Sequence, residues 1–271
     1  MQHFYIQPLA YDDIPLLEGM PPAEWHLDIV RFFRMHYGRS YFSAVAAWQG
    51  TQLAGVGMLV VNGASAWLGN IITREGFRGQ GIGYAVTEAL CAFGKRLGCV
   101  SMQLIATEMG RPVYEKLGFR AVENYLFTKG GEQRAAPDES CIAPLENAPW
   151  AAVLALDQAA VGEDRSAILE AFAAGGRAWM EENRLRGFYL PQFGDGLIIA
   201  DSEAAGIGLL RYKHYDRPGL TANLPEANTN ALRYLQSIGY ETVRVAPRMF
   251  LGVDNVRRPE MIYSRIGGYL G

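Results

Sequence analysis

The sequence predicts an α+β protein built around an antiparallel meander. Three strand-like runs follow one another at 41–48, 52–61 and 66–73. Gln49-Gly50 and Asn62-Gly63 separate these runs, and Asn-Gly between two apolar runs is typical of a hairpin turn. The pattern then changes to a helical period, with one apolar face formed by Val86, Leu90, Phe93 and Leu97. This change from strands to a helix supports the α+β class.

The remaining elements of the first half are shorter. We expect a strand over 3–8, helices over 11–18 and 24–36, and a strand over 100–105. Gly98 is a suitable C-terminal stop for the long helix. A short helix begins at Pro112 and ends at Gly118, and a strand follows over 119–128.

The composition changes after Gly130, which predicts two domains. Residues 131–149 contain prolines, charges and small side chains and are interpreted as a linker between domains 1–130 and 150–271. The predicted elements of the second half are helices over 150–160, 164–183 and 227–237, and strands over 187–190, 196–200, 206–213 and 241–250.

The bulk composition excludes several classes of function. The formal net charge is −3 and no basic stripe is present, which argues against nucleic acid as a partner. The three cysteines have no CxxC spacing, so neither a disulfide framework nor a metal site is expected. No signal peptide or apolar stretch of membrane-spanning length is present, so we expect no membrane partner and a cytoplasmic location. The sequence leaves open whether the protein forms a homodimer.

The segment Arg78-Gly79-Gln80-Gly81-Ile82-Gly83 carries the clearest chemical signal. A strand enters this glycine-rich loop and an amphipathic helix leaves it, so backbone N–H groups and the helix dipole favour a bound phosphate. The Gly-Lys-Ser/Thr of a Walker loop is absent. A dinucleotide-binding fold would need parallel strands before the loop. The loop by itself is also compatible with a helix start that binds nothing.

The segments that follow make the interpretation specific. The loop resembles the Arg/Gln-x-x-Gly-x-Gly/Ala coenzyme-A signature of the GNAT acetyltransferase superfamily. The strand 100–105 and the run Tyr114-Glu115-Lys116-Leu117-Gly118-Phe119 resemble the second signature of that family. The resemblance covers about residues 3–128. It implies the GNAT fold, a mixed and mostly antiparallel sheet flanked by helices, with acetyl-CoA as the acyl donor.

The resemblance also implies how the donor is bound. The residues that would cradle the pyrophosphate are Arg78, Gly79, Gln80, Gly81, Ile82 and Gly83. The backbone of Ile71, Ile72 and Thr73 would pair with the pantetheine arm as an added strand does. In the family, the fourth and fifth strands separate to admit this arm.

Tyr114 is the predicted catalytic residue, because the tyrosine of this motif often protonates the departing thiolate in the family. The alternative is a helix residue that packs under the cofactor. Many relatives have a glutamate on the strand before the loop, but here Ala66-Trp67-Leu68-Gly69-Asn70 contains no carboxylate. The general base is therefore unassigned. Glu108 is a candidate, and a solvated loop carboxylate is its alternative interpretation. Backbone N–H groups near Ile72 and Thr73 would stabilise the oxyanion.

The second half contains a weaker echo of the first. Leu235-Gln236-Ser237-Ile238-Gly239-Tyr240 resembles the run from Tyr114 to Phe119 without the tyrosine, and no glycine loop precedes it. We therefore expect a degenerate GNAT-like domain.

This domain also resembles the C-terminal domain of some bacterial GNAT proteins, through Asp157, Gly162, Asp164 and Arg165. Asp164 and Arg165 would help to build the acceptor site, or Asp164 would cap a helix and Arg165 would pair with Asp157. Further acceptor-site candidates are Trp25, His26, Tyr37 and Tyr212.

The predicted function is transfer of an acetyl group from acetyl-CoA to a primary amine of a small molecule, by direct attack in a ternary complex. The near-neutral charge and the second domain favour a small acceptor. Two alternatives stay open. One is acetylation of a protein N-terminus or lysine, and the other is a non-catalytic acyl-CoA sensor.

Overall fold

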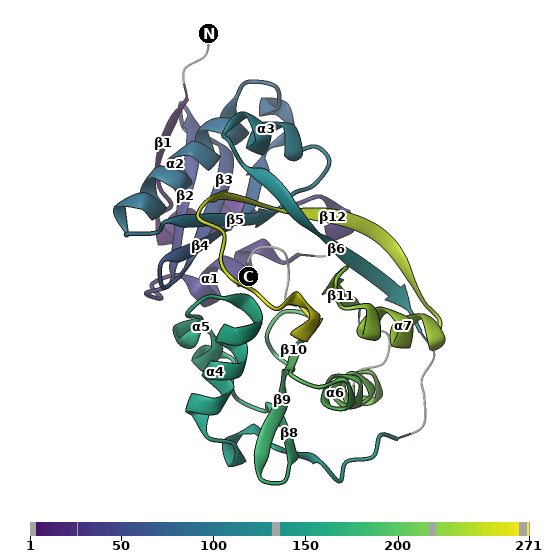
Figure 1. The fold of residues 1–271 in the computed structure, drawn as a ribbon. Coiled ribbons are helices and arrows are strands. Elements are labelled where there is room, and N and C mark those ends of the chain that lie inside the picture. The colour runs from purple at the N-terminus through teal and green to yellow at the C-terminus, as the bar shows by residue number, and fades with distance from the viewer. Residues whose placement is uncertain (1–3, 26, 132–135, 217–220, 266–269, 271) are drawn as a thin grey trace. The chain divides into compact units, whose positions relative to one another are not determined.

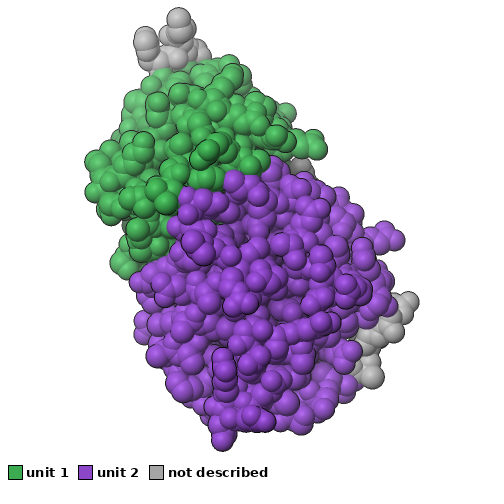
Figure 2. Space-filling model, viewed as in Figure 1, with its two compact units in different colours: residues 1–121, 249–253, 268–270 green, residues 122–248, 254–267, 271 purple. Residues whose placement is uncertain are grey.

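The structure is a computed structural model that describes residues 4–25, 27–131, 136–216, 221–265 and 270. The chain forms two compact units (Figure 2). Unit 1 contains Met1–Ala121, Met249–Val253 and Gly268–Leu270, and unit 2 contains Val122–Arg248, Asp254–Gly267 and Gly271. No helix among the described residues has the length and apolar character needed to cross a membrane.

Unit 1 is built on the predicted meander (Figure 1). Its strands are β1 (Tyr5–Pro8), β2 (Phe42–Gln49), β3 (Gln52–Asn62), β4 (Ser65–Thr73) and β5 (Ser101–Ile105). The first four pair antiparallel in chain order, and β4 pairs parallel with β5. Asn62 pairs with Ser65 across a turn in which Gly63 has a φ of 61°. The hairpin predicted from Asn62-Gly63 is therefore confirmed.

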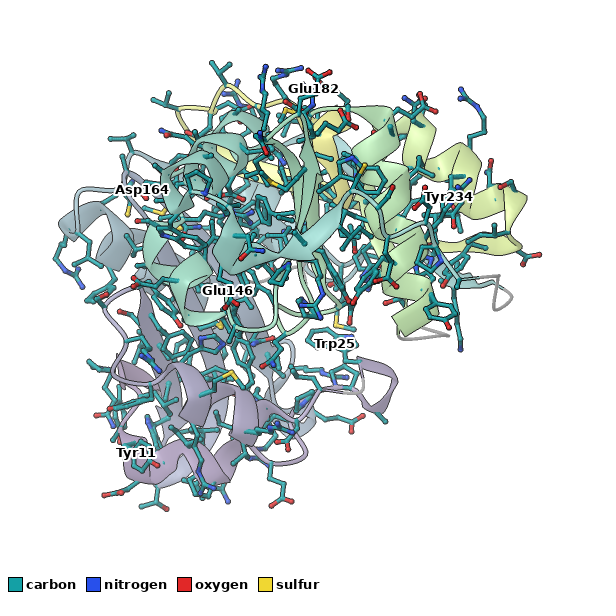
Figure 3. The ribbon with its side chains drawn as sticks, turned by 90° about the horizontal axis from the view of Figure 1, so that it is seen from below. Tyr11, Trp25, Glu146, Asp164, Glu182 and Tyr234 are labelled. Carbon is teal, nitrogen blue, oxygen red and sulfur yellow. The ribbon has the colours of Figure 1, made fainter. Side chains whose placement is uncertain are left out.

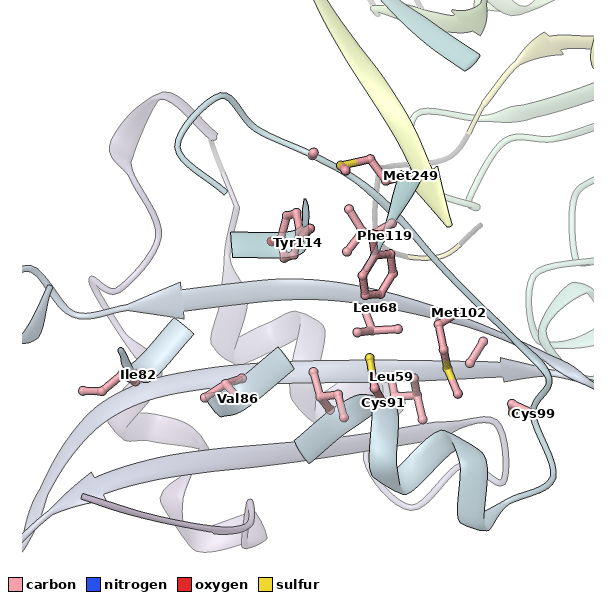
Figure 4. Close-up of a cluster of buried hydrophobic side chains, with 14 of the residues drawn as sticks. Leu59, Leu68, Ile82, Val86, Cys91, Cys99, Met102, Tyr114, Phe119 and Met249 are labelled. Carbon is pink, nitrogen blue, oxygen red and sulfur yellow. The ribbon is translucent and has the colours of Figure 1, made fainter. Parts of the chain in front are cut away.

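Helices cover both faces of this sheet. The helical elements are η1 (Tyr11–Leu17), η2 (Ala23–Trp25), α1 (Ile29–His36), η3 (Glu75–Phe77), α2 (Ile82–Arg96) and α3 (Arg111–Lys116). The apolar stripe of α2 packs on one face, where Ile82 and Val86 lie over the strands (Figure 4). On the other face, Phe33 of α1 packs edge-on against Phe42 of β2, with ring centroids 5.6 Å apart.

Two glycines of β3 set how closely α2 approaches the sheet. A Cβ atom at Gly55 would lie 2.6 Å from Ile82 Cγ2, and one at Gly57 would lie 2.5 Å from Val86 Cγ1. Both distances are well below van der Waals contact. The side-chain-free surface of β3 therefore brings the beginning of α2 close to the end of β4.

Unit 2 contains two sheets. Its strands are β6 (Arg120–Gly130), β7 (Ile142–Pro144), β8 (Arg177–Glu181), β9 (Arg184–Leu190), β10 (Leu197–Ala200), β11 (Ala222–Pro225), β12 (Tyr240–Gly252) and β13 (Ile262–Ser264). One sheet has the order β13-β10-β9-β8-β7, and the other contains β12, β6 and β11. The helical elements are η4 (Leu145–Asn147), α4 (Trp150–Val161), α5 (Ser166–Ala171), α6 (Glu203–Asp216), α7 (Thr229–Ser237) and η5 (Pro259–Met261).

The long strands β6 and β12 each contribute residues to both compact units. β6 follows α3 of unit 1, yet from Val122 onward it belongs to unit 2. β12 follows α7 of unit 2, yet Met249–Val253 belongs to unit 1, where β12 lies beside β5. In unit 1, Val253 donates a hydrogen bond to Val100 O at 3.1 Å. The compact units therefore differ from the expected domains 1–130 and 150–271.

Several element predictions for the second half were wrong. Residues 206–213 form part of helix α6 rather than a strand, and the expected helix over 164–183 ends at Ala171 and is followed by β8. The interpreted linker 131–149 contains β7 and η4. The echo of the second signature is confirmed at the backbone level, because Gly118 and Gly239 both follow a helix with φ near +90°, at 89° and 86°.

In the first half, the expected helix over 24–36 is interrupted, since η2 ends at Trp25 and α1 begins at Ile29.

Candidate functional site

The glycine loop forms an open cradle at the beginning of α2. Gly79 and Gly81 have φ values of 76° and 82°, a conformation that favours glycine. Cβ atoms at these two positions would meet no atom of the described residues within 4 Å. The glycines are therefore required by the backbone conformation and not by neighbouring side chains, and the space beside the loop is open.

The electrostatics of the cradle suit an anion. The first hydrogen bond at this end of α2 runs from Ala85 N–H to Gly81 O at 3.0 Å, so the N–H groups of the preceding helical residues point out of the helix. The first turn carries no acidic side chain, whereas the last turn carries Lys95 and Arg96. Arg78 is exposed beside the loop. Arg74 is not available, because it donates to Leu53 O at 3.1 Å and Leu16 O at 2.8 Å.

The two strands next to the cradle separate. β4 and β5 pair from Ser65–Ser101 to Trp67–Gln103, and no further pair joins them although β4 continues to Thr73. The separated part of β4 contains Ile71, Ile72 and Thr73. The Oγ1 of Thr73 lies 3.6 Å from the place that a Gly83 Cβ would take, so this strand end borders the cradle. An extended ligand arm could pair with the exposed edge of β4 here.

A β-bulge lies within the separated part of β4. Val56 pairs with Ile72 and Met58 with Gly69, so Gly57 opposes both Asn70 and Ile71. Asn70 has a φ of 47°, in the left-handed region that non-glycine residues seldom adopt. This bulge changes the direction of the strand at the position where β4 has lost its partner β5.

Tyr114 lies on α3 with 8% of its surface exposed, and its ring packs with Phe119, the ring centroids being 6.0 Å apart (Figure 4). A Cβ atom at Gly110 would lie 2.8 Å from Tyr114 Cε2 and 3.1 Å from its hydroxyl, so Gly110 makes room for the phenol. Burial raises the pKa of Tyr114 to about 12. The phenol therefore keeps its proton through the neutral and mildly alkaline range.

Glu108 lies exposed in the turn that joins β5 to α3. Trp25 is partly exposed in η2 (Figure 3). The Tyr37 hydroxyl donates to Leu9 O at 3.3 Å, and Tyr212 accepts from Arg177 Nε at 3.0 Å. His26 lies outside the described residues.

The second-domain candidates have clear local roles in unit 2. Arg165 is 2% exposed and binds Asp157 through two hydrogen bonds, one of them from Nε to Oδ2 at 3.0 Å. Asp164 is exposed and accepts from Ser166 N–H at 3.0 Å (Figure 3). Hydrogen bonding by the side chain and then by the backbone N–H of Ser166 lowers the pKa of Asp164. Gly162 has a φ of 72°, and a Cβ there would lie 2.3 Å from Val256 O. These contacts thus hold the loop between α4 and α5 in a fixed conformation. A role for Asp164 or Arg165 in acceptor binding stays a prediction.

Comparison with known families decides the assignment of both halves. The model of the acetyltransferase (GNAT) family matches residues 11–119, and a second acetyltransferase (GNAT) domain model matches residues 153–264. The chain is a tandem GNAT protein. It has the GNAT fold in two GNAT-like domains.

Solved structures agree with this fold. A protein from Pyrococcus horikoshii described as an acetyltransferase matches with a TM-score of 0.84 and 22% identity, covering 100% of this chain and 97% of that chain. A GCN5-related N-acetyltransferase from Sphaerobacter thermophilus matches with a TM-score of 0.64 and 15% identity, covering 94% and 98%. At these identities the likeness establishes the GNAT fold over the whole length of this chain.

A curated relative covers a shorter stretch. Glucosamine 6-phosphate N-acetyltransferase from Trypanosoma brucei brucei is 37% identical over 57 residues, which are 21% of this chain. The chain spans only 39% of the length of this relative.

The sequence interpretation missed two features of this GNAT site. Asn70 appeared only as part of a strand without a carboxylate, although an asparagine is among the residues that tolerate a left-handed backbone. Gly110 was not considered, because the need for space beside Tyr114 becomes visible only when the turn after β5 is folded. The signal in the sequence for Asn70 was that residues 66–70 contain no carboxylate, whereas many family members have a glutamate on this strand.

Proposed function

We propose that the chain transfers an acetyl group from acetyl-CoA to a primary amine of a small molecule, by direct attack in a ternary complex. One observation supports this proposal above the others. In unit 1, the open glycine cradle lies next to the end of β4 that no longer pairs with β5. The cradle suits a pyrophosphate and the strand edge suits an extended amide-containing arm. Acetyl-CoA carries both groups on one molecule, and when bound it supplies the activated acyl carbonyl.

In this proposal the residues of the chain bind and orient. The backbone from Arg78 to Gly83 holds the pyrophosphate, and Ile71, Ile72 and Thr73 pair with the arm. Tyr114 donates its O–H to the departing sulfur. A thiol has a pKa of about 8.5, whereas that of Tyr114 is about 12. Tyr114 therefore keeps its proton in the free protein, and its O–H is available to the departing sulfur.

A small amine is supported by the named relative, whose acceptor is an amino sugar phosphate. The match is confined to 57 residues, so it supports the chemical class of the acceptor and leaves its identity to experiment. Glu108 is retained as a proposed acceptor-side residue, as are Asp164 and Arg165 in the second domain.

Ligand binding is tested by thermal unfolding with and without acetyl-CoA. A ligand at a hundredfold excess over Kd stabilises the folded state by about 2.7 kcal/mol. Gly83→Leu should fold, since Thr73 Oγ1, at 3.6 Å, is the one atom of the described residues within 4 Å of its Cβ, but it should lose this stabilisation. Gly76→Leu is the matched control, because nothing lies within 4 Å of that position either. Stabilisation that survives in Gly83→Leu would place the cofactor elsewhere.

Turnover is tested by release of free thiol from acetyl-CoA over a broad panel of primary amines. Acetylated product from at least one small amine is the expected result. Binding of acetyl-CoA without transfer to any amine would instead support the sensor. Transfer only to a protein N-terminus or lysine would support the protein acetyltransferase.

A further inference from the structure

Asn70 is a buried polar residue in the separated part of β4. It forms the β-bulge on the separated end of β4 and is 5% exposed. Its Nδ2 lies 3.5 Å from Met58 Sδ, and a thioether sulfur is a weak acceptor. Within the described part of the chain, no hydrogen bond is recorded for its Oδ1.

The side chain of Asn70 lies on the face of the sheet opposite α2. Gly55 and Gly57 face α2, so Met58, the next residue along β3, faces the other way. The contact between Asn70 and Met58 places Asn70 on that same face. The donor cradle is at the start of α2. An acceptor that attacks from the side opposite the donor therefore approaches Asn70.

An amide group can orient an amine but cannot serve as a base. Its carbonyl oxygen accepts a hydrogen bond from an amine N–H, and it takes up no proton near neutral pH. Titratable or charged side chains of unit 1 include Asp13, His36, Arg39, Tyr41, Arg74 and Glu108. No hydrogen bond recorded among the described residues joins any of them to Asn70.

Three of these side chains are engaged or poorly suited as bases. His36 Nδ1 pairs with the Tyr41 hydroxyl at 3.1 Å, and burial, assisted by the charge of Arg39, lowers the pKa of His36 to about 4. Arg74 is tied to two carbonyl groups. Asp13 lies in η1 and Glu108 in the exposed turn after β5, and both are in contact with solvent.

We propose that Asn70 binds the attacking nitrogen and that the enzyme selects weakly basic primary amines, such as α-amino groups or amino sugars, over lysine-like alkyl amines. This inference rests on the proposed acetyltransferase function. The neutral amine enters with one N–H donated to Asn70 Oδ1. The N–C bond forms as the C–S bond breaks, the amine releases one proton to water, and the sulfur takes up one proton from Tyr114, which solvent replaces.

The preference follows from the fraction of each amine that is neutral. At pH 7.5 an alkyl amine with a pKa near 10.4 is about 0.1% neutral, whereas an α-amino group with a pKa of 7.7–8.0 is about 25–40% neutral. The reactive form is thus a few hundred times more abundant for the weak base. The weaker base is also a poorer nucleophile. The rate constant of the neutral amine falls less than in proportion to its basicity, so the larger fraction of neutral amine has the greater effect on the observed rate.

The test compares the pH dependence of kcat/KM for glycinamide, ethanolamine and propylamine in the full-length protein. Each profile is expected to rise to the pKa of its own amine, and glycinamide is expected to be the best acceptor at pH 7.5. A break at one fixed pH for all three amines would reveal a base on the enzyme and overturn the inference. If acetyl-CoA is bound but no amine of the broad panel is acetylated, the proposed function itself fails.

Asn70→Gly tests the residue. Glycine keeps the left-handed backbone and removes the amide together with its Cβ. The variant is expected to keep its stabilisation by acetyl-CoA and to lose about tenfold or more in kcat/KM for the amine. Asn183→Gly is the matched control, because Asn183 is also left-handed, with a φ of 63°, in the β8–β9 turn. Asn70→Asp should add a pH break common to all amines. Unchanged kinetics in both Asn70 variants would refute the role.

Discussion

Lowering the pH from 7.5 to 5 is expected to destabilise unit 2 by about 2 kcal/mol through His214 alone. His214 lies on α6, is 8% exposed and stacks on Tyr240 with ring centroids 4.9 Å apart. Among the described residues, neither of its ring nitrogens has a hydrogen-bond partner. Burial, together with the charge of Lys213, lowers its pKa to about 3.

The sign follows from the two pKa values. The unfolded chain binds a proton at His214 below about pH 6.5, whereas the folded chain does so only near pH 3. Between these values the unfolded state holds more protons, so the stability present above pH 6.5 is lost as the pH falls. Each pH unit in this window costs about 1.4 kcal/mol, and pH 5 lies about 1.5 units below the unfolded pKa.

Chemical denaturation at pH 7.5 and pH 5 measures this loss for the wild type and for His214→Phe. Phenylalanine keeps a ring against Tyr240 and removes the titration, so the loss between the two pH values should be about 2 kcal/mol smaller in the variant. His36, whose pKa is about 4, retains its own contribution in both proteins. Equal losses in wild type and variant would refute the assignment of a depressed pKa to His214.

Three further substitutions test other parts of the structure. Gly57→Val should lower the stability of unit 1 by about 1–3 kcal/mol, because its Cβ would lie 2.5 Å from Val86 Cγ1; a thermal unfolding midpoint equal to that of the wild type would contradict the close packing of α2. Arg165→Met should cost about 3–5 kcal/mol by leaving Asp157 buried without its partner, and adding Asp157→Leu should restore most of this loss in denaturant titrations. Tyr114→Phe should lower kcat about 10²–10⁴-fold with unchanged stabilisation by acetyl-CoA, and an unchanged kcat would limit Tyr114 to packing.

The first half was predictable because its signals are local. The turn at Asn62-Gly63, the α2 residues Val86 and Leu90 and the glycines 79 and 81 each act within a few residues. Leu97, expected on the same apolar face, is instead 50% exposed at the end of α2. The glycine loop before α2 could therefore be expected from the sequence alone. The bulge at Asn70 could not, since it depends on the register between β3 and β4.

The errors in the second half have a tertiary cause. Gly206 and Gly208 reduce the helix propensity of 206–213 by about 1 kcal/mol each, which favoured a strand in the prediction. In the folded chain, a Cβ at Gly206 would lie 2.2 Å from the Tyr263 ring, and one at Gly208 would lie 2.0 Å from the Trp179 ring. These glycines thus serve aromatic packing against α6. Only the partners, distant in sequence, reveal this reason.

The placement of Met249–Val253 in unit 1 has a consequence for synthesis on the ribosome. The N-terminal half emerges first, but its sheet lacks the strand beside β5 until about 130 more residues have been added. At about 5–20 residues per second this delay is about 7–26 s. During that interval the edge of β5 is open to pairing with other nascent chains. The same dependence means that a gene fragment ending near residue 130 encodes a sheet that lacks the strand beside β5.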